Sequence, residues 1–141
     1  MNLLHLVLAA LAAFVAYMAV GALVFWLSPS LKTEFLKYPA VYRDHDGQMS
    51  HLPIGMVGIF VSILTLAVLY AQIYEGGSGL AAGARFGALI GVFVLCTFTL
   101  HNYVNLNIGL KLTVQQSLAY FVQWLIVGIV IGLVYGSLAA H

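Results

Sequence analysis

Four long hydrophobic runs restrict the fold of this chain more than any other feature. They cover residues 3–27, 52–74, 80–103 and 114–138. A helix that crosses the hydrocarbon core of a bilayer needs about 20 mostly apolar residues, and each run meets this requirement. Backbone groups in lipid must form their hydrogen bonds within the segment, which favours helices. We therefore predict an all-α fold, a four-helix transmembrane bundle, with all 141 residues in one integral membrane domain.

The charge content of the chain supports the same assignment. Only 6% of the residues are charged and 63% are hydrophobic, whereas a soluble domain carries about 25% charged residues. The formal net charge is +1, which gives no reason to expect a nucleic acid as a partner. We expect the lipid bilayer as the environment. The single cysteine, Cys96, cannot form an intrachain disulfide.

The connection between the first two runs, residues 28–50, is the only sizeable loop. It begins with SPSLKTEFLKYP, in which Ser28 can cap a helix whose first residue is Pro29. The apolar side chains on one face of such a helix are Leu31, Phe35 and Tyr38. We predict a short helix that lies in the membrane interface and ends near Pro39. The alternative is an irregular loop.

Lysine and arginine residues lie mostly on one side of the predicted bundle. The first and third connections share this side, which we call the loop side, and they contain Lys32, Lys37, Arg43 and Lys111. The opposite side, which we call the terminal side, holds both termini and Arg85. The positive-inside rule then places the loop side in the cytoplasm and the termini on the non-cytoplasmic side. We expect a multi-pass integral membrane protein with this orientation, in the bacterial inner membrane if the family resemblance given below holds.

The third and fourth runs each contain a row of three glycines spaced four residues apart. The rows are Gly83, Gly87 and Gly91, and Gly128, Gly132 and Gly136. Such a row places its glycines on one helix face and allows another helix to approach closely. Both rows lie in the terminal-side half of their helix, so an antiparallel pair of helices brings them face to face. In the alternative, the rows serve separate contacts or other subunits.

The loop-side half of the same two helices carries most of the amide and imidazole groups. The candidate ligand-binding residues are His101, Asn102, Asn105, Gln116, Tyr120, Gln123 and Trp124. Thr97, His101 and Asn105 share one face if the third helix continues. Two explanations stay open. The groups form a polar pocket for a small molecule, or they satisfy one another and the loose backbone at the helix end, because unpaired buried polar groups are costly.

The sequence shows no pattern of catalytic or metal-binding residues. Asp44, His45, Asp46 and His51 are close in the first loop, but the chain lacks HExxH and CxxC motifs, and we predict no metal site and no cofactor. No run contains an acidic residue, which disfavours acid–base catalysis and proton-coupled transport. Pro53 stands in the first turn of the second run, unlike the mid-helix breaks of transporters. The sequence leaves open whether a pigment or metal is ligated by His5, His51 or His101.

Two short motifs carry a resemblance to a known family. The first run closes with FWLSP (residues 25–29) and the third with LHNYVN (residues 100–105). With its four-span length, the chain resembles the small four-span bacterial integral membrane proteins of a domain-of-unknown-function family. Leu27 stands where that family has a tyrosine. The resemblance implies a four-helix membrane fold and no activity; the family-like positions are Trp26, Ser28, Pro29, Asn102 and Asn105.

These features favour a non-enzymatic protein that serves as an accessory or structural subunit of a larger membrane protein complex. A second surface of small residues for a neighbouring helix lies on the first run and consists of Ala9, Ala12, Ala13, Ala16 and Ala19. The alternative function is binding or transport of a lipid, quinone or pigment in a polar pocket near His101.

Overall fold

The computed structural model describes residues 2–139, and this part of the chain contains helices and no strands. In chain order the elements are α1 (Leu3–Leu27), α2 (Pro29–Phe35), α3 (His45–Ile73), α4 (Gly79–Val94), the π-helical segment η1 (Leu95–Leu100), α5 (His101–Asn105) and α6 (Leu110–Ala139). Four helical stretches are long and apolar enough to span a membrane: α1, α3, α4 continued through α5, and α6. The prediction of an all-α, four-helix transmembrane bundle is confirmed, and the protein is a multi-pass membrane protein.

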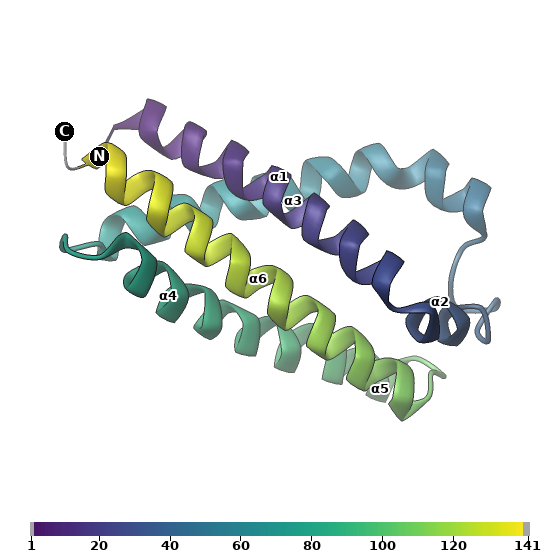
Figure 1. Ribbon diagram of the computed structural model, residues 1–141. Helices are drawn as coiled ribbons and strands as arrows, with labels where there is room; N and C mark the ends of the chain where they lie inside the picture. Colours follow the sequence, from purple (N-terminus) through teal and green to yellow (C-terminus); the bar gives the residue numbers. More distant parts are fainter. Residues whose placement is uncertain (1, 140–141) are drawn as a thin grey trace.

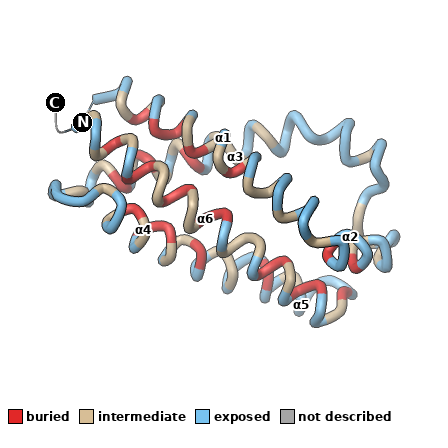
Figure 2. The backbone as a smooth tube through the Cα atoms, viewed as in Figure 1, coloured by how far each residue is buried: buried red, intermediate tan, exposed pale blue. Residues whose placement is uncertain are grey.

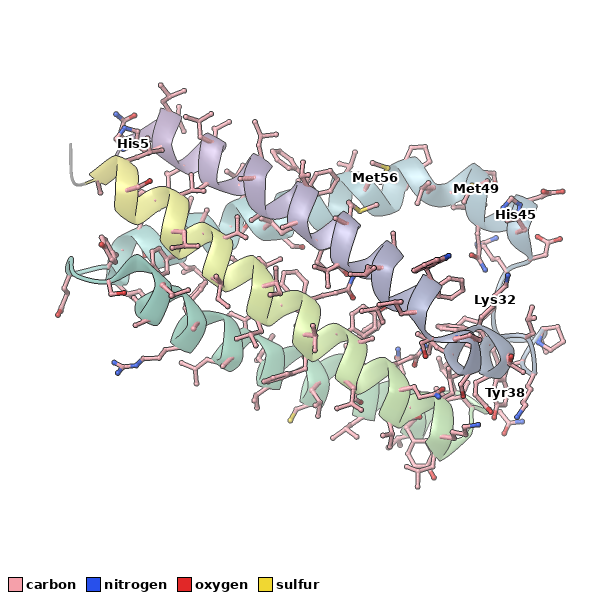
Figure 3. All side chains as sticks on the ribbon, viewed as in Figure 1. His5, Lys32, Tyr38, His45, Met49 and Met56 are labelled. Carbon is pink, nitrogen blue, oxygen red and sulfur yellow. The ribbon has the colours of Figure 1, made fainter. Side chains whose placement is uncertain are left out.

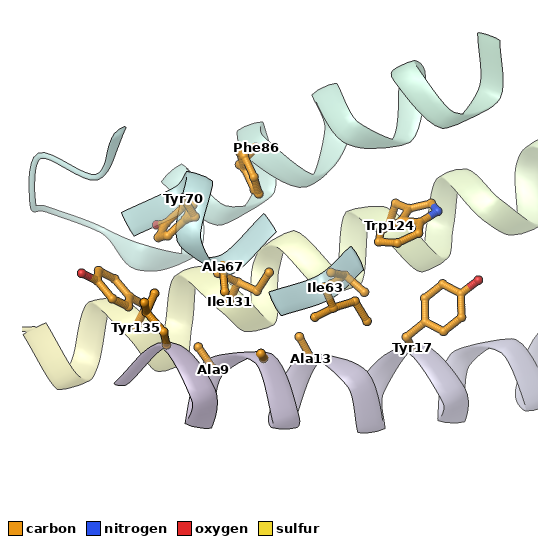
Figure 4. Packing of buried hydrophobic residues seen from close by; sticks show 13 residues of the cluster. Ala9, Ala13, Tyr17, Ile63, Ala67, Tyr70, Phe86, Trp124, Ile131 and Tyr135 are labelled. Carbon is orange, nitrogen blue, oxygen red and sulfur yellow. The ribbon is translucent and has the colours of Figure 1, made fainter. Parts of the chain in front are cut away.

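Helix α6 forms the centre of the bundle. It packs against α4 on one side and α1 on the other, and α3 packs mainly on α1 (Figure 1). The start of α1, the end of α6 and the turn between α3 and α4 lie together at the terminal side (Figure 1). Alanines of α1, including Ala9 and Ala13, face Ile63 and Ala67 of α3 and Ile131 of α6 in the main hydrophobic core (Figure 4).

The structure brings the two glycine rows into contact. An added Cβ on Gly83 would lie 3.0 Å from the Cα of Gly132, and one on Gly87 would lie 3.0 Å from the Cα of Gly128. Real Cβ atoms are almost never closer than this to backbone, so any side chain here would push α4 and α6 apart. The outer members pair differently: Gly91 faces Phe121, and Gly136 faces both Tyr74 and Gly79.

Aromatic side chains close the terminal side of the bundle around Tyr70 of α3. Its ring lies 5.4 Å from Phe86 of α4 and 6.1 Å from Tyr135 of α6, measured between ring centroids. Both pairs have the edge-to-face geometry that aromatic rings prefer. Three helices therefore meet at one buried tyrosine, which is 1% exposed.

Helix α3 leaves the bundle on the loop side. Residues 45–58 are exposed on every face of the helix apart from partly buried Gly47 and Met56 (Figure 2). Its fully buried residues, Ile63, Ala67 and Tyr70, all lie in the second half. At 1.5 Å per residue, roughly 20 Å of helix has no fully buried side chain.

The beginning of α3 also corrects the position of a proline. The helix starts at His45, so Pro53 lies about two turns inside it, and the prediction that this residue stands in the first turn is wrong. Asp44 caps the helix by accepting the N–H of Gly47 at 2.9 Å, which the apolar run starting at residue 52 did not indicate. Pro53 removes one backbone hydrogen bond from α3.

The first loop contains the short helix that its sequence predicts. Pro29 stands at the first position of α2, and Leu31 is buried in a second hydrophobic cluster with Ile108 and Leu112. Two details differ from the prediction. The Ser28 side chain makes no capping hydrogen bond, and the helix ends at Phe35, before Pro39.

Candidate functional site

Three of the predicted site residues on α6, Gln116, Gln123 and Trp124, contact α1 or the first loop. Gln123 is buried, and its amide donates to the backbone oxygen of Tyr17 at 3.4 Å. Gln116 is also buried and donates to the hydroxyl of Tyr42 at 3.1 Å. The ring of Trp124 lies 5.2 Å from that of Tyr17. These contacts join α6 to α1 and to the loop that follows α2.

A cavity of about 190 Å³ lies between α1, α2 and the same stretch of α6. Its polar lining comes from Tyr17, Gln116, Tyr120 and Gln123, and its apolar lining from Val24, Phe25, Leu31, Phe35 and Ala119, with Gly21 completing the wall. Ligand pockets usually enclose about 300–1,000 Å³. The cavity can therefore accept one ring or a short chain with a hydrogen-bonding group, and it is smaller than a pocket for a whole lipid or quinone.

The structure separates the predicted ligand-binding residues into two groups. Gln116, Tyr120 and Gln123 line the cavity and Trp124 packs beside Tyr17, whereas His101, Asn102 and Asn105 lie on α5 and are not in its wall. The side chain of Asn105 donates to the backbone oxygen of His101 at 2.9 Å, and both residues are exposed. Asn105 thus bonds to backbone near the end of the third membrane-crossing stretch.

Two threonines of the π-helical segment η1 form hydrogen bonds just before α5. The hydroxyl of Thr99 donates to the backbone oxygen of Leu95 at 2.7 Å and accepts from the hydroxyl of Ser117 at 2.9 Å. Thr97, the first member of the predicted polar face, donates to the oxygen of Phe93 at 2.7 Å. Thr97 is exposed, as are His101 and Asn105, so this face points outward from the bundle.

A buried carboxylate joins the first loop to α6. Glu34 is 4% exposed, and its Oε1 atom lies 2.7 Å from the Nζ of Lys37 and 2.9 Å from the Nζ of Lys111. The hydrogen bonds from Lys111 and Lys37 lower the pKa of Glu34 below its ordinary value, and Glu34 raises the pKa of Lys37. The spacing of Glu34 and Lys37 on one helical face suggests their pairing, but no sequence signal places Lys111 beside them.

Two neutral hydrogen bonds reinforce this junction. The hydroxyl of Tyr38 accepts the N–H of Gly109 at 2.9 Å, and Ser30 accepts the side-chain amide of Gln115 at 2.9 Å. Together with the Glu34 ion pairs and the bond from Gln116 to Tyr42, these contacts fasten α2 and the following loop to the start of α6. We call this set the loop clamp.

A larger hollow, of about 330 Å³, lies where the end of α1, the helix α2 and the start of α3 meet. Its lining residues are Phe25, Lys32, Phe35, Leu36, Arg43, Asp44, His45 and Gln48. A neighbouring cavity of about 190 Å³ shares Phe35, Leu36, Arg43, Asp44 and Gln48 with it. Apart from Asp44 and His45, the sequence did not single out these residues, because the set comes from three helices and the loop between α2 and α3, and their meeting depends on the path of that loop.

The acidic and histidine residues at the end of the first loop and the start of α3 make local contacts. Within residues 2–139 no three His, Cys, Asp or Glu side chains are grouped closely enough to hold a metal ion. The Nδ1 atom of His45 lies 3.4 Å from Asp46, and that of His51 lies 2.8 Å from the backbone oxygen of Gly47.

Comparison with known proteins found no family model, no curated protein and no solved structure that matches this chain.

Proposed function

We propose that this membrane protein is a non-enzymatic accessory or structural subunit of a larger membrane protein complex. We place it in the bacterial inner membrane with both termini on the non-cytoplasmic side, because Lys32, Lys37, Arg43 and Lys111 are all on the loop side. The absence of acidic residues from the four apolar runs supports a role without acid–base chemistry.

The observation that carries the proposal is the free first half of α3. A helix of a self-sufficient bundle buries a stripe along its length, and α6 does so from Leu112 to Tyr135. On α3, Gly55 and Gly58 have no atom of another element within 4 Å of an added Cβ. Small residues on an exposed helix face are the positions at which another transmembrane helix can approach closely.

The proposal predicts that a bulky side chain on this face prevents assembly with the partner without lowering the stability of the isolated chain. We expect Gly58→Leu to fold normally, since the new side chain meets open space, but to lose the co-purifying partner in a mild detergent extract of native membranes. Ala81→Leu is the control, because Ala81 is exposed on α4 and the substitution places the same leucine side chain on a different exposed helix. The readouts are the mass of the complex on a native gel and the melting temperature of the isolated chain.

The proposal fails if the wild-type protein is extracted as a monomer without a stoichiometric partner. It also fails if Gly58→Leu retains the partner as well as the control does. A lower melting temperature for isolated Gly58→Leu would mean that this face packs within the chain.

A second candidate function, binding of a small molecule, is favoured by the cavity beside Gln123. Its two amides and two phenols sit among apolar side chains, which is the usual composition of a ligand pocket. The test is the amount of lipid, quinone or pigment that copurifies with Gln123→Leu, compared with His101→Ala. Loss of one compound in the first variant alone supports binding at this cavity; equal amounts in both variants and the wild type contradict it.

A further inference from the structure

We propose that the hollow between α1, α2 and the start of α3 binds the phosphate group of an anionic phospholipid from the loop-side leaflet. The hollow combines cationic side chains with an apolar wall and opens beside the free half of α3. This inference does not depend on the proposed subunit role, because it rests on the charged wall of the hollow and not on Gly55 or Gly58.

Two cations in the wall of the hollow are available to an anion. Neither Lys32 nor Arg43 forms an ion pair with any residue of the range 2–139, whereas the other two loop-side cations, Lys37 and Lys111, are both bound to Glu34. In Figure 3, Lys32 lies between α2 and the first turn of α3, where His45 is labelled. Two unpaired cations that face one hollow suit a phosphodiester.

The remaining titratable groups of the wall leave a net positive charge. Asp44 is the one acidic residue in the lining, and its Oδ1 atom already accepts the N–H of Gly47 at 2.9 Å as the cap of α3. His45 contributes a further imidazole to the wall. An anion in the hollow therefore meets the positive charges of Lys32 and Arg43. It also meets the negative charge of Asp44, which already accepts a hydrogen bond from the first turn of α3.

The position of Arg43 is fixed by local structure. Its backbone oxygen accepts the side-chain amide of Gln48 at 2.7 Å. Its side chain lies against Gly47, where an added Cβ would be 3.3 Å from the Cβ of Arg43 and 3.8 Å from its Cδ. The missing side chain at Gly47 allows the arginine to lie along the first turn of α3.

The apolar wall and the depth of the hollow indicate a lipid as the source of the phosphate. Phe25 is close to the end of α1, where the chain leaves the hydrophobic run, Phe35 is the last residue of α2, and Leu36 follows it. The first half of α3, which borders the hollow at His45 and Gln48, is exposed and diverges from α1 (Figure 1). In a bilayer, acyl chains lie against such an exposed apolar helix, and a lipid seated there carries its phosphate to the level of Lys32 and Arg43.

Native mass spectrometry of the detergent-purified chain, titrated with dioleoylphosphatidylglycerol, tests the proposal. Since a cation near a membrane surface contributes about 1 kcal/mol to binding of anionic lipid, we expect Lys32→Gln and Arg43→Gln each to weaken binding about fivefold and the double variant about 30-fold. Lys37→Gln is the matched control. It removes the same charge from the loop that follows α2, but this lysine does not line the hollow, so binding should stay within about twofold.

Three further measurements give the proposal definite ways to fail. Lys32→Arg should retain binding, which separates loss of charge from misfolding. Equal weakening by Lys37→Gln and Lys32→Gln would overturn the proposal, because only the overall charge would matter. Equally tight binding of dioleoylphosphatidylcholine would overturn it too, and equally tight binding of glycerol 3-phosphate would show that the hollow takes a soluble phosphate.

Discussion

Glycine has two opposite roles in this molecule, and both depend on what surrounds the missing side chain. At Gly87 an added Cβ would lie 2.6 Å from the backbone oxygen of Leu125 and 2.8 Å from that of Trp124, so only hydrogen fits between α4 and α6. At Gly58 an added Cβ meets no other element. The first glycine makes a contact within the chain, and the second leaves a surface free.

This contrast predicts opposite effects of the same substitution. Gly87→Ala should destabilise the bundle by about 1–3 kcal/mol, because backbone atoms must move to admit the methyl group. Gly58→Ala should be neutral or stabilise the chain by up to about 0.5–1 kcal/mol, because alanine is the better helix former. Thermal unfolding of the two purified variants measures the difference. Equal melting temperatures would mean that α4 and α6 are not in backbone contact.

Two polar residues on the loop side, one buried and one exposed, should differ in how much they contribute to the stability of the fold. Gln123→Ala should lower stability by about 1 kcal/mol, since it removes a buried hydrogen bond between α6 and α1. His101→Ala should leave stability unchanged, because the side chain is exposed and its backbone oxygen still accepts from Asn105. Unfolding in mixed detergent micelles gives both values. A larger loss of stability for His101→Ala than for Gln123→Ala would contradict the position of α5, in which the His101 side chain is exposed.

Among the elements, α2 depends most on electrostatic contacts. The carboxylate of Glu34 is the centre of the loop clamp, and the two lysines that bind it come from the loop and from α6. Replacement of Glu34 by glutamine leaves two cations without their partner, so we expect α2 to detach while the transmembrane helices stay packed.

The lowered pKa of Glu34 makes this contact dependent on pH. A carboxylate whose pKa is lower in the folded state stabilises the fold fully above its ordinary pKa of 4.5, and this contribution is lost as the pH falls through the lower folded value. The protection factors of the α2 amides, which correct for the pH dependence of intrinsic exchange, should therefore be high at neutral pH and fall below pH 4.5. In Glu34→Gln the protection factors should be low both at neutral pH and below pH 4.5. If Glu34→Gln showed the same pH dependence of exchange in α2 as the wild type, the loop clamp would be excluded as the cause of that dependence.

The sequence predicts the elements better than their arrangement. Apolar runs set the membrane-spanning stretches, and Pro29 with Leu31 and Phe35 indicated the short helix, because these signals are local. The pairing of Glu34 with Lys111 was not predictable, since it depends on how the loop crosses the end of α6. The start of α3 was missed for a related reason: its first two turns are polar and lie before the apolar run.

The whole molecule is closed at one end and open at the other. On the terminal side, glycine contacts and the aromatic rings around Tyr70 hold α3, α4 and α6 together. On the loop side, α2 and its clamp occupy the end of the bundle beside α6, and α3 diverges. The exposed surface of residues 45–58, which is apolar from Leu52 onward, is therefore available to lipid and, in our proposal, to another subunit.

An oxygen-accessibility scan of α3 tests this open arrangement most directly. Single spin labels are placed along residues 48–73 of the isolated chain, after replacement of the exposed Cys96 by alanine. We predict uniformly high accessibility in residues 48–58 and a helical period with minima at Ile63, Ala67 and Tyr70 in the second half. The same period of protection throughout residues 48–58 would show that the first half of α3 packs within its own chain, and would contradict the account.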